Sequence, residues 1–150
     1  MLPVFLVGAL GETIGRELSL SETAIGAVVT TLFVAAAVAA PIAGRVVERV
    51  GAGIALRTGV FVAGTGAAVI GAFANGWWQL AAPMAVVGLA VAMIDTGSAR
   101  AFADRVPAHA QGFAFGIKEA SIPGASMLAG LSLPTVAAVL GWRASFVAAT

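Results

Sequence analysis

The 150-residue sequence contains no cysteine and only one histidine, and charged residues make up 10% of it. Without cysteine the chain has no disulfide, no thiolate zinc site, no iron–sulfur cluster and no cysteine nucleophile. One histidine is too few for the usual metal-ligand sets, so we predict neither a metal nor a cofactor. Eight basic and seven acidic residues leave a net charge of +1, which provides no basic field for nucleic acid. We therefore expect neither an enzyme nor a nucleic-acid-binding protein.

Apolar residues are abundant instead, at 60% of the chain with a mean hydropathy of +1.02. A water-soluble globule needs more polar surface than this composition supplies. The lipid bilayer is therefore the expected solvent and the first partner of the chain. Because a helix rises about 1.5 Å per residue and about 30 Å of hydrocarbon must be crossed, uncharged runs of roughly 20 residues mark the crossings.

The predicted fold is all-α, a polytopic transmembrane helical bundle that forms a single membrane domain. Its four full spans are expected at about residues 23–44, 58–74, 77–98 and 113–140. The second and third come from one long uncharged run that divides at Ala74-Asn75-Gly76, a turn signal. Residues 1–10 give a partial first helix and residues 144–150 start a further one. These short ends lead us to expect that the chain is a fragment of a longer protein.

Basic residues predict the orientation of the bundle, because they are retained on the cytoplasmic side. Five of them fall on one side of the predicted spans: Arg45, Arg49, Arg57, Arg100 and Arg105. The opposite side holds only Arg16 and Arg143. This distribution predicts a multi-pass protein of the inner (plasma) membrane with a cytoplasmic N-terminus. Three tryptophans then fall at outer helix ends, where indole rings favour the interface: Trp77, Trp78 and Trp142.

Small residues recur every fourth position on three predicted helices, which lets helix backbones approach closely. The stripes are Ala27, Thr31, Ala35, Ala39 and Ala43; Gly59, Ala63, Ala67 and Gly71; and Gly112, Gly116, Ala120 and Gly124. The last helix also contains Pro123 and Pro134, which free backbone groups that neighbouring helices must satisfy. We therefore expect this helix to be bent and to lie in the interior of a compact bundle.

The first candidate site is the charged link between the spans at 23–44 and 58–74. It comprises Gly44, Glu48, Arg49, Gly51 and Arg57. The two glycines permit close backbone approach or a positive φ at the ends of a short connection. Glu48 is suited to cap a helix N-terminus or to pair with an arginine from another segment, forming a latch that breaks when helices move. The alternative is ordinary positive-inside anchoring, which explains the arginines alone.

The second candidate site is a set of intramembrane charges, Asp95, Lys118 and Glu119. A charged side chain near a helix centre costs about 2.5–3.5 kcal/mol on insertion scales and so usually faces protein or water. Asp95 and Lys118 lie at similar depth, about 7 and 9 Å into consecutive antiparallel helices, which makes an ion pair possible. Lys118 and Glu119 are about 100° apart on one helix, so we expect them to face different surroundings, one of them a cavity. The alternative is that all three snorkel to the headgroups.

Two segments of the chain resemble a known family. Gly44-Arg45-Val46-Val47-Glu48-Arg49-Val50-Gly51 is similar to the loop signature Gly-x-Leu-x-Asp-Arg-x-Gly of the major facilitator superfamily, with Glu48 in place of Asp. Gly141-Trp142-Arg143-Ala144-Ser145-Phe146 resembles the Gly-Trp-Arg-x-x-Phe that opens helix six in bacterial members. The resemblance covers the N-terminal six-helix half of a twelve-helix architecture.

This resemblance implies a permease that moves a small solute, with or without a coupling ion, by alternating access. Glu48 and Arg49 would hold the cytoplasmic gate, and Asp95 with Lys118 would support or line the cavity. A C-terminal half or a second copy would be needed for a complete path. Two other readings stay open: a small carrier that acts as a homodimer, and a non-transporting subunit of a membrane complex.

Overall fold

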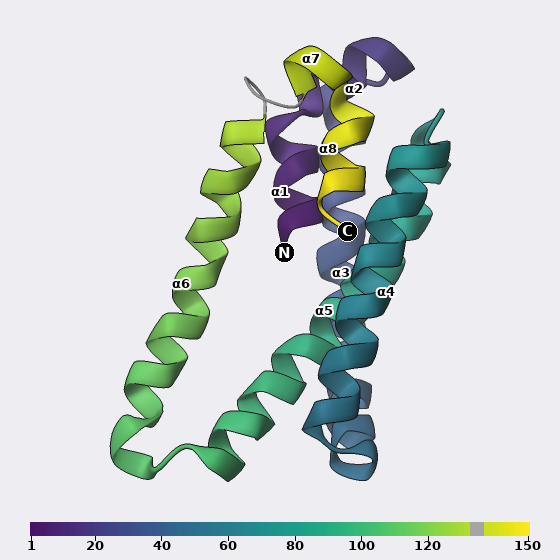
Figure 1. Ribbon diagram of the computed structural model, residues 1–150. Coiled ribbons are helices and arrows are strands. Elements are labelled where there is room, and N and C mark those ends of the chain that lie inside the picture. Colours follow the sequence, from purple (N-terminus) through teal and green to yellow (C-terminus); the bar gives the residue numbers. More distant parts are fainter. Residues whose placement is uncertain (133–136) are drawn as a thin grey trace.

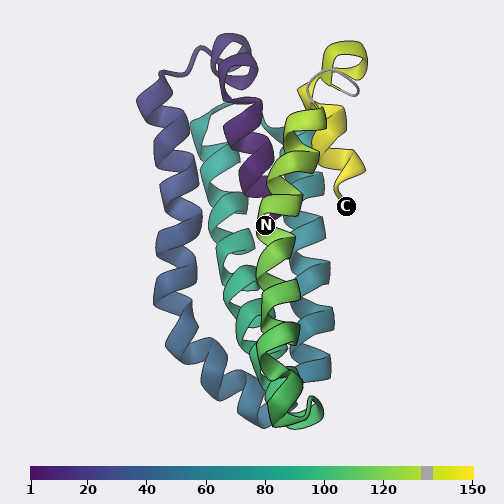
Figure 2. The same ribbon diagram turned by 90° about the vertical axis from the view of Figure 1, so that its left-hand side faces the viewer.

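The structure is a computed structural model that describes residues 1–132 and 137–150. These residues form helices and no strand, which confirms the predicted all-α fold. The helices are α1 (Leu2–Ala9), α2 (Gly11–Leu18), α3 (Glu22–Val50), α4 (Ala52–Phe73), α5 (Trp77–Arg105), α6 (Ala108–Ser132), α7 (Ala138–Leu140) and α8 (Trp142–Ala148). The long helices run up and down a common axis, and both termini lie part-way along it (Figures 1 and 2).

Three of the described helices, α3, α4 and α5, are long and apolar enough to cross a membrane. They correspond to the first three predicted full spans. The fourth, predicted at 113–140, includes residues 133–136 with Pro134, which lie outside the described residues. Its described part, α6, has 25 residues but carries Lys118 and Glu119 and is not among the membrane-span candidates of the described chain.

The ends of α3 and α4 differ from the sequence prediction. α3 continues past Gly44 to Val50, and α4 begins at Ala52 rather than near residue 58. The charged residues did not mark the helix ends, because Arg and Glu are good helix formers. A charged residue limits the part of a helix that can lie in the hydrocarbon, but the helix itself can continue beyond it. The break comes at Gly51, whose φ of 85° is unfavourable for any residue with a side chain.

The predicted first loop is also partly helical. Residues Gly11–Leu18 form α2, whose Ile14 is fully buried and whose Glu12 and Arg16 pair at 3.3 Å on the outer face. This amphipathic pattern explains why a polar segment folds against the bundle. The helix ends at Ser19, which adopts a left-handed conformation with φ 54°.

The bundle has two distinct ends. The α3–α4 and α5–α6 turns lie at one end, which we call the Gly51 end; α2, the α4–α5 turn and α7 lie at the other (Figure 1). The five arginines that predict a cytoplasmic side all lie toward the Gly51 end. Trp77 and Trp142 begin helices at the other end, but Trp142 is only 1% exposed. The expectation that all three tryptophans lie at the lipid interface is therefore wrong for Trp142, which packs in the core.

Helix α5 is the centre of the bundle, because α3 and α4 both pack along it. Small residues make this possible; of the three glycines at these contacts, Gly59 belongs to a predicted stripe, whereas Gly66 and Gly88 do not. A side chain at Gly88 would collide with the carbonyl oxygen of Leu32, and one at Gly66 would lie 2.6 Å from Val87 Cγ2. At Gly59 the clash would be with Ile94, also at 2.6 Å. The helices therefore approach to backbone contact, which gives the close packing that apolar helices in lipid rely on.

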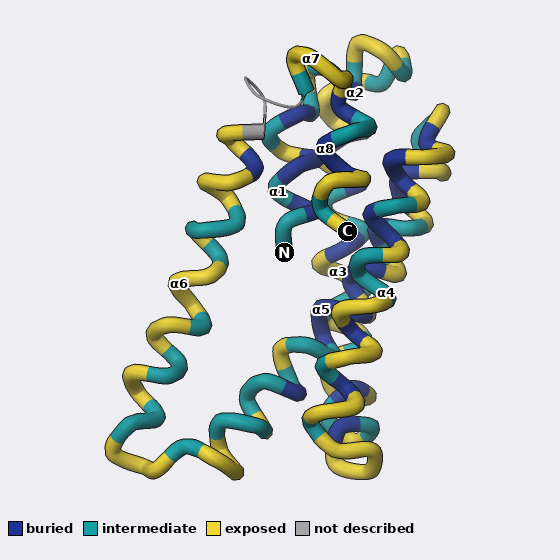
Figure 3. The backbone as a smooth tube through the Cα atoms, in the orientation of Figure 1, coloured by how far each residue is buried: buried dark blue, intermediate teal, exposed yellow. Residues whose placement is uncertain are grey.

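Helix α6 departs from the prediction of an interior helix. It packs on α1 and α5 but is exposed over most of its described length, and Figure 3 shows the contrast with α5. A side chain added at Gly112, Gly116 or Gly124 would meet nothing within 4 Å. The turn at Val106–Pro107 directs α6 away from α3 and α4, so its small-residue stripe has no helix of the described chain against it.

Candidate functional site

The first candidate site is built around a one-residue turn. Gly51 is the single residue between α3 and α4; its N–H donates to the carbonyl oxygen of Val47 at 2.9 Å, and its own carbonyl accepts from Ala55 N–H at 3.2 Å. Gly51 thus needs a positive φ, as the sequence predicts. Gly44 does not: it lies inside α3, and a side chain there would meet nothing within 4 Å. The expected role of Gly44 in the turn is therefore wrong.

The charged residues of this site point away from the bundle. Ala43, Val47 and Ala55 are buried against it, whereas Arg45, Glu48, Arg49 and Arg57 are exposed. In the described parts of the chain none of these four side chains forms an ion pair. The predicted latch therefore has no partner among the described residues. The site exposes three arginine side chains and one carboxylate on the surface of the bundle.

The second candidate site is brought together by the α5–α6 hairpin. Lys118 Nζ on α6 lies 3.2 Å from Asp95 Oδ1 on α5, so the predicted ion pair forms. The same ammonium lies 3.1 Å from Glu119 Oε1. The long flexible lysine side chain thus reaches both carboxylates. That Lys118 and Glu119 face different surroundings, one of them a cavity, stays a prediction.

The three charges form a compact triad with a net charge of −1. Lys118 is 22% exposed, whereas Asp95 and Glu119 are 51% and 59% exposed. An ammonium group has three N–H donors, of which two serve these carboxylates. The carboxylates retain acceptor capacity on their exposed side. The triad can therefore exchange one partner for an ion or for a polar group of a solute without leaving Lys118 uncompensated.

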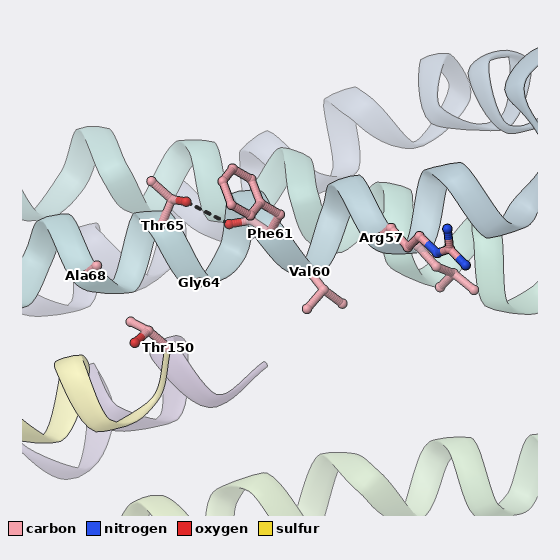
Figure 4. Close-up of a pocket in the computed structure, with 8 residues that line it drawn as sticks. Arg57, Val60, Phe61, Gly64, Thr65, Ala68 and Thr150 are labelled. Atoms are coloured by element: carbon pink, nitrogen blue, oxygen red, sulfur yellow. Dashed lines mark hydrogen bonds between the residues drawn. The ribbon is translucent and has the colours of Figure 1, made fainter.

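A groove runs along α4 between Arg57 and Thr150, with a volume of about 690 Å³ (Figure 4). Its walls are mostly apolar and include Val60, Phe61 and Gly64. The hydroxyl of Thr65 donates to the carbonyl oxygen of Phe61 at 2.8 Å, so it is already used inside α4. Among the described residues that line the groove, Arg57 alone has a charged side chain. The groove therefore offers little to orient a polar solute, and we assign it no solute site.

The sequence did not predict a third polar cluster, at the end opposite Gly51. Glu17 on α2 accepts from Arg143 Nη1 and from Trp142 Nε1, the latter at 2.6 Å. Arg143 also donates through Nη2 to the carbonyl oxygen of Ala74 at 2.8 Å and to Asn75 Oδ1 at 3.3 Å. We call these five residues the clasp. It joins α2, the C-terminal end of α4 and α8.

The electrostatics of the clasp act on Glu17. Hydrogen bonding from Arg143 lowers the pKa of the Glu17 carboxyl below its usual value; partial burial opposes this shift, and the Trp142 N–H adds to it. The guanidinium of Arg143 also lies 4.4 Å from the centre of the Trp142 ring, a cation–π contact. The Gly-Trp-Arg motif signalled two members of the cluster, but nothing in the sequence indicated Glu17 as their partner.

Comparison with known proteins agrees with this architecture. The Major Facilitator Superfamily matches residues 2–150, almost the whole chain. The chain belongs to the Major Facilitator Superfamily. Members of the Major Facilitator Superfamily are membrane transporters of small molecules rather than enzymes. No curated protein and no solved structure matches the chain.

Proposed function

We propose that this chain forms one helical set of a permease that moves a small solute across the inner membrane of a bacterium by alternating access. Its family membership supports the general activity. The observation that carries the assignment to particular residues is the Lys118 triad, which joins α5 to α6 and keeps two carboxylates partly exposed. Charged groups among membrane helices mark transport paths when they face a cavity rather than lipid.

The position of α6 supports a path beside the triad. The stripe of Gly112, Gly116, Ala120 and Gly124 lies on the same helix as Lys118 and has open space in front of its glycines. Small residues of this kind suit contact with a further helix or with a moving solute. In this family the path lies between two helical sets near the bilayer midplane. We propose that the second set, from a C-terminal half or a second copy, faces α6.

The Gly51 end is proposed to be the cytoplasmic gate. Glu48, Arg49 and Arg57 are exposed and unpaired among the described residues, which suits them to pair with the second helical set when the path closes on that side. The positive-inside distribution supports a cytoplasmic position for this end. Each gate contact would be an exposed ion pair, worth only about 1 kcal/mol or less and therefore reversible.

Cysteine accessibility tests the proposed path, because the chain has no cysteine of its own. Gly116→Cys and Ala120→Cys are placed on the stripe of α6, and Val38→Cys, at an exposed position of α3 (67% exposed), serves as the lipid-facing control. We expect a membrane-impermeant maleimide to label the two α6 positions and not position 38. Equal labelling at all three positions, or labelling of position 38 alone, would contradict a water-accessible path along α6.

Flux measurements distinguish the alternative functions. The chain is reconstituted in vesicles with radiolabelled sugars, amino acids and organic acids, beside a Lys118→Met variant. Flux that requires Lys118 and two copies of the chain supports a homodimeric carrier. Flux that appears only when a second six-helix set is co-expressed supports a two-part permease. Stable co-purification with a larger membrane protein, without flux, favours the non-transporting subunit.

A further inference from the structure

The groove along α4 has walls that suit a hydrocarbon chain better than a polar solute. Its lining residues on α4 run from Leu56 to Ala68, which at about 1.5 Å per residue is roughly 18 Å along the helix axis. Val60 and Phe61 are 61% and 75% exposed there, and the Thr65 hydroxyl is bonded within α4. The groove therefore extends over about the depth of one leaflet, half of the roughly 30 Å of hydrocarbon.

Arg57 supplies the charge of the described lining, at the end of the groove away from Thr150 (Figure 4). Helix α4 is a membrane-span candidate of 22 residues, about 33 Å, so nearly its whole length is needed to cross about 30 Å of hydrocarbon. Arg57 lies six residues, about 9 Å, after Gly51, and the exposed Ile54 precedes it. The backbone of Arg57 therefore lies within the hydrocarbon layer, and its side chain must reach back toward the headgroups.

The arginines of α3 provide a comparison at the same end of the bundle. The 29 residues of α3 span about 43 Å, about 13 Å more than the hydrocarbon requires. Arg45 and Arg49, in its last two turns, can therefore lie in water. Arg57 has no such length of helix beyond it, and no residue of 1–132 or 137–150 forms an ion pair with it. Because a guanidinium at this depth is costly without a partner, Arg57 is the arginine that gains most from an anion in the membrane.

We propose that the groove binds an anionic phospholipid of the leaflet on the Gly51 side, with its phosphate on Arg57 and one acyl chain along α4 toward Thr150. A guanidinium pairs with phosphate through two parallel hydrogen bonds, and the apolar walls accommodate the chain. A free phosphate would leave those walls uncovered. In the proposed orientation this is the cytoplasmic leaflet, which carries the anionic lipids. Glu48 and Arg49 then remain for the proposed gate, and the lipid site does not require that the chain moves a solute.

Fluorescence quenching by brominated phospholipids tests the proposal in the full chain reconstituted in vesicles, because the chain has no cysteine of its own. Thr65→Cys places a fluorescent label in the groove, and Val38→Cys places it on an exposed face of α3. The two positions are 14 and 13 residues from Gly51 and hence at similar depth. The vesicles mix phosphatidylglycerol with phosphatidylcholine, and either lipid carries bromine on its acyl chains. We expect the preference for phosphatidylglycerol to be at least about threefold higher at position 65 than at position 38.

Variants then connect this preference to the phosphate contact. In the Thr65→Cys background, Arg57→Gln should lower the preference to the value at position 38, whereas Arg57→Lys keeps the charge and should retain about half of it. Arg45→Gln is the matched control, because it removes an exposed arginine of the same end that does not line the groove, and it should change nothing. Gly64→Leu fills the groove without removing a charge and should also lower the preference.

Three results would overturn the proposal. Equal preferences at positions 65 and 38 would show that only bulk lipid contacts α4. A preference that Arg57→Gln leaves unchanged would show that this arginine does not hold the phosphate. A label at position 65 that neither lipid quenches would show that protein, such as a second copy of the chain, covers the groove. None of these results would bear on the proposed transport function, which is measured by flux and by labelling along α6.

Discussion

The helices of the bundle terminate differently at its two ends. At the clasp end, helix termini are joined by side chains from elsewhere: Arg143 takes the carbonyl oxygen of Ala74 at the end of α4, and Glu17 takes the N–H groups of Trp142 and Arg143. At the Gly51 end, a single residue with φ 85° reverses the chain, and the charges beside it stay exposed. The comparison shows that charged residues near a membrane-helix end can join helix termini, or can stay exposed without an ion pair among the described residues.

The largest expected effect comes from the buried tryptophan of the clasp. Trp142→Ala removes a core side chain at 1% exposure together with its hydrogen bond to Glu17, and should lower the free energy of unfolding by about 3–5 kcal/mol. Trp78→Ala is the control, since that side chain is 74% exposed and should cost well under about 1 kcal/mol. Equilibrium unfolding in detergent measures both. Similar losses of unfolding free energy in the two variants would contradict the distinction between the buried Trp142 and the exposed Trp78.

The Lys118 triad, between the two ends, is expected to show the next largest effect. Lys118→Met leaves two carboxylates close together without their cation and should cost about 2 kcal/mol, less than breaking a fully buried pair. Asp95→Asn should cost less, because Glu119 still holds Lys118. Accumulation in membranes and thermal stability measure the effect of each variant. The double variant, Lys118→Met with Asp95→Asn, should recover part of the stability that Lys118→Met loses. A larger loss for Asp95→Asn than for Lys118→Met would contradict the shared role of the lysine.

The turn at the Gly51 end should be moderately sensitive. Gly51→Ala places a side chain on a residue with φ 85° and is expected to destabilise by about 1–2 kcal/mol through backbone strain. Gly53→Ala, inside the first turn of α4 with open space around it, should be neutral or slightly stabilising because alanine is the better helix former. Thermal unfolding of the two variants provides the comparison, and equal effects would show that the turn is not set by Gly51.

The smallest expected effect is a difference in pH dependence between the ends. Because Arg143 lowers the pKa of Glu17, the clasp contributes its full stability above the ordinary glutamate pKa and loses it as the pH falls toward the lowered value. The loss should be below about 1 kcal/mol, since Glu17 is partly exposed. Glu17→Gln should abolish this acid dependence, whereas Glu48→Gln should leave it unchanged. Unfolding curves recorded between neutral and acidic pH measure this dependence. If the unfolding free energy of Glu17→Gln fell with pH as steeply as that of the unaltered chain, the Glu17 carboxylate would be excluded as the source.

Much of the fold was predictable from the sequence, because long uncharged runs mark hydrocarbon crossings directly. The Asp95–Lys118 pair was predictable as well, since an antiparallel hairpin fixes the depth of both residues. The ends of α3 and α4 were not, because helices continue through charges until a residue such as Gly51 breaks them. The clasp was not predictable from the sequence for a different reason. Glu17 and Arg143 lie near opposite ends of the chain, and only tertiary packing brings them together.

The burial of Trp142 and the exposure of α6 were missed for the same physical reason. Residue type predicts that an indole ring suits the interface and that a glycine stripe suits a helix contact. It does not indicate which neighbour is present. Helix α8 turns Trp142 into the core, and the α5–α6 turn leaves Gly112 and Gly116 without a facing helix among residues 1–132 and 137–150.

The one-residue turn at Gly51 also has a consequence for biogenesis. A connection this short gives α3 and α4 almost no freedom to integrate into the bilayer one after the other, since the second helix begins as soon as the first has ended. In the proposed orientation, the pair would enter the membrane as a preformed helical hairpin, and the charged residues at its tip would stay in the cytoplasm. The arginines that surround Gly51 would then act during synthesis, as a stop that holds the tip of the hairpin on the side of the translation machinery.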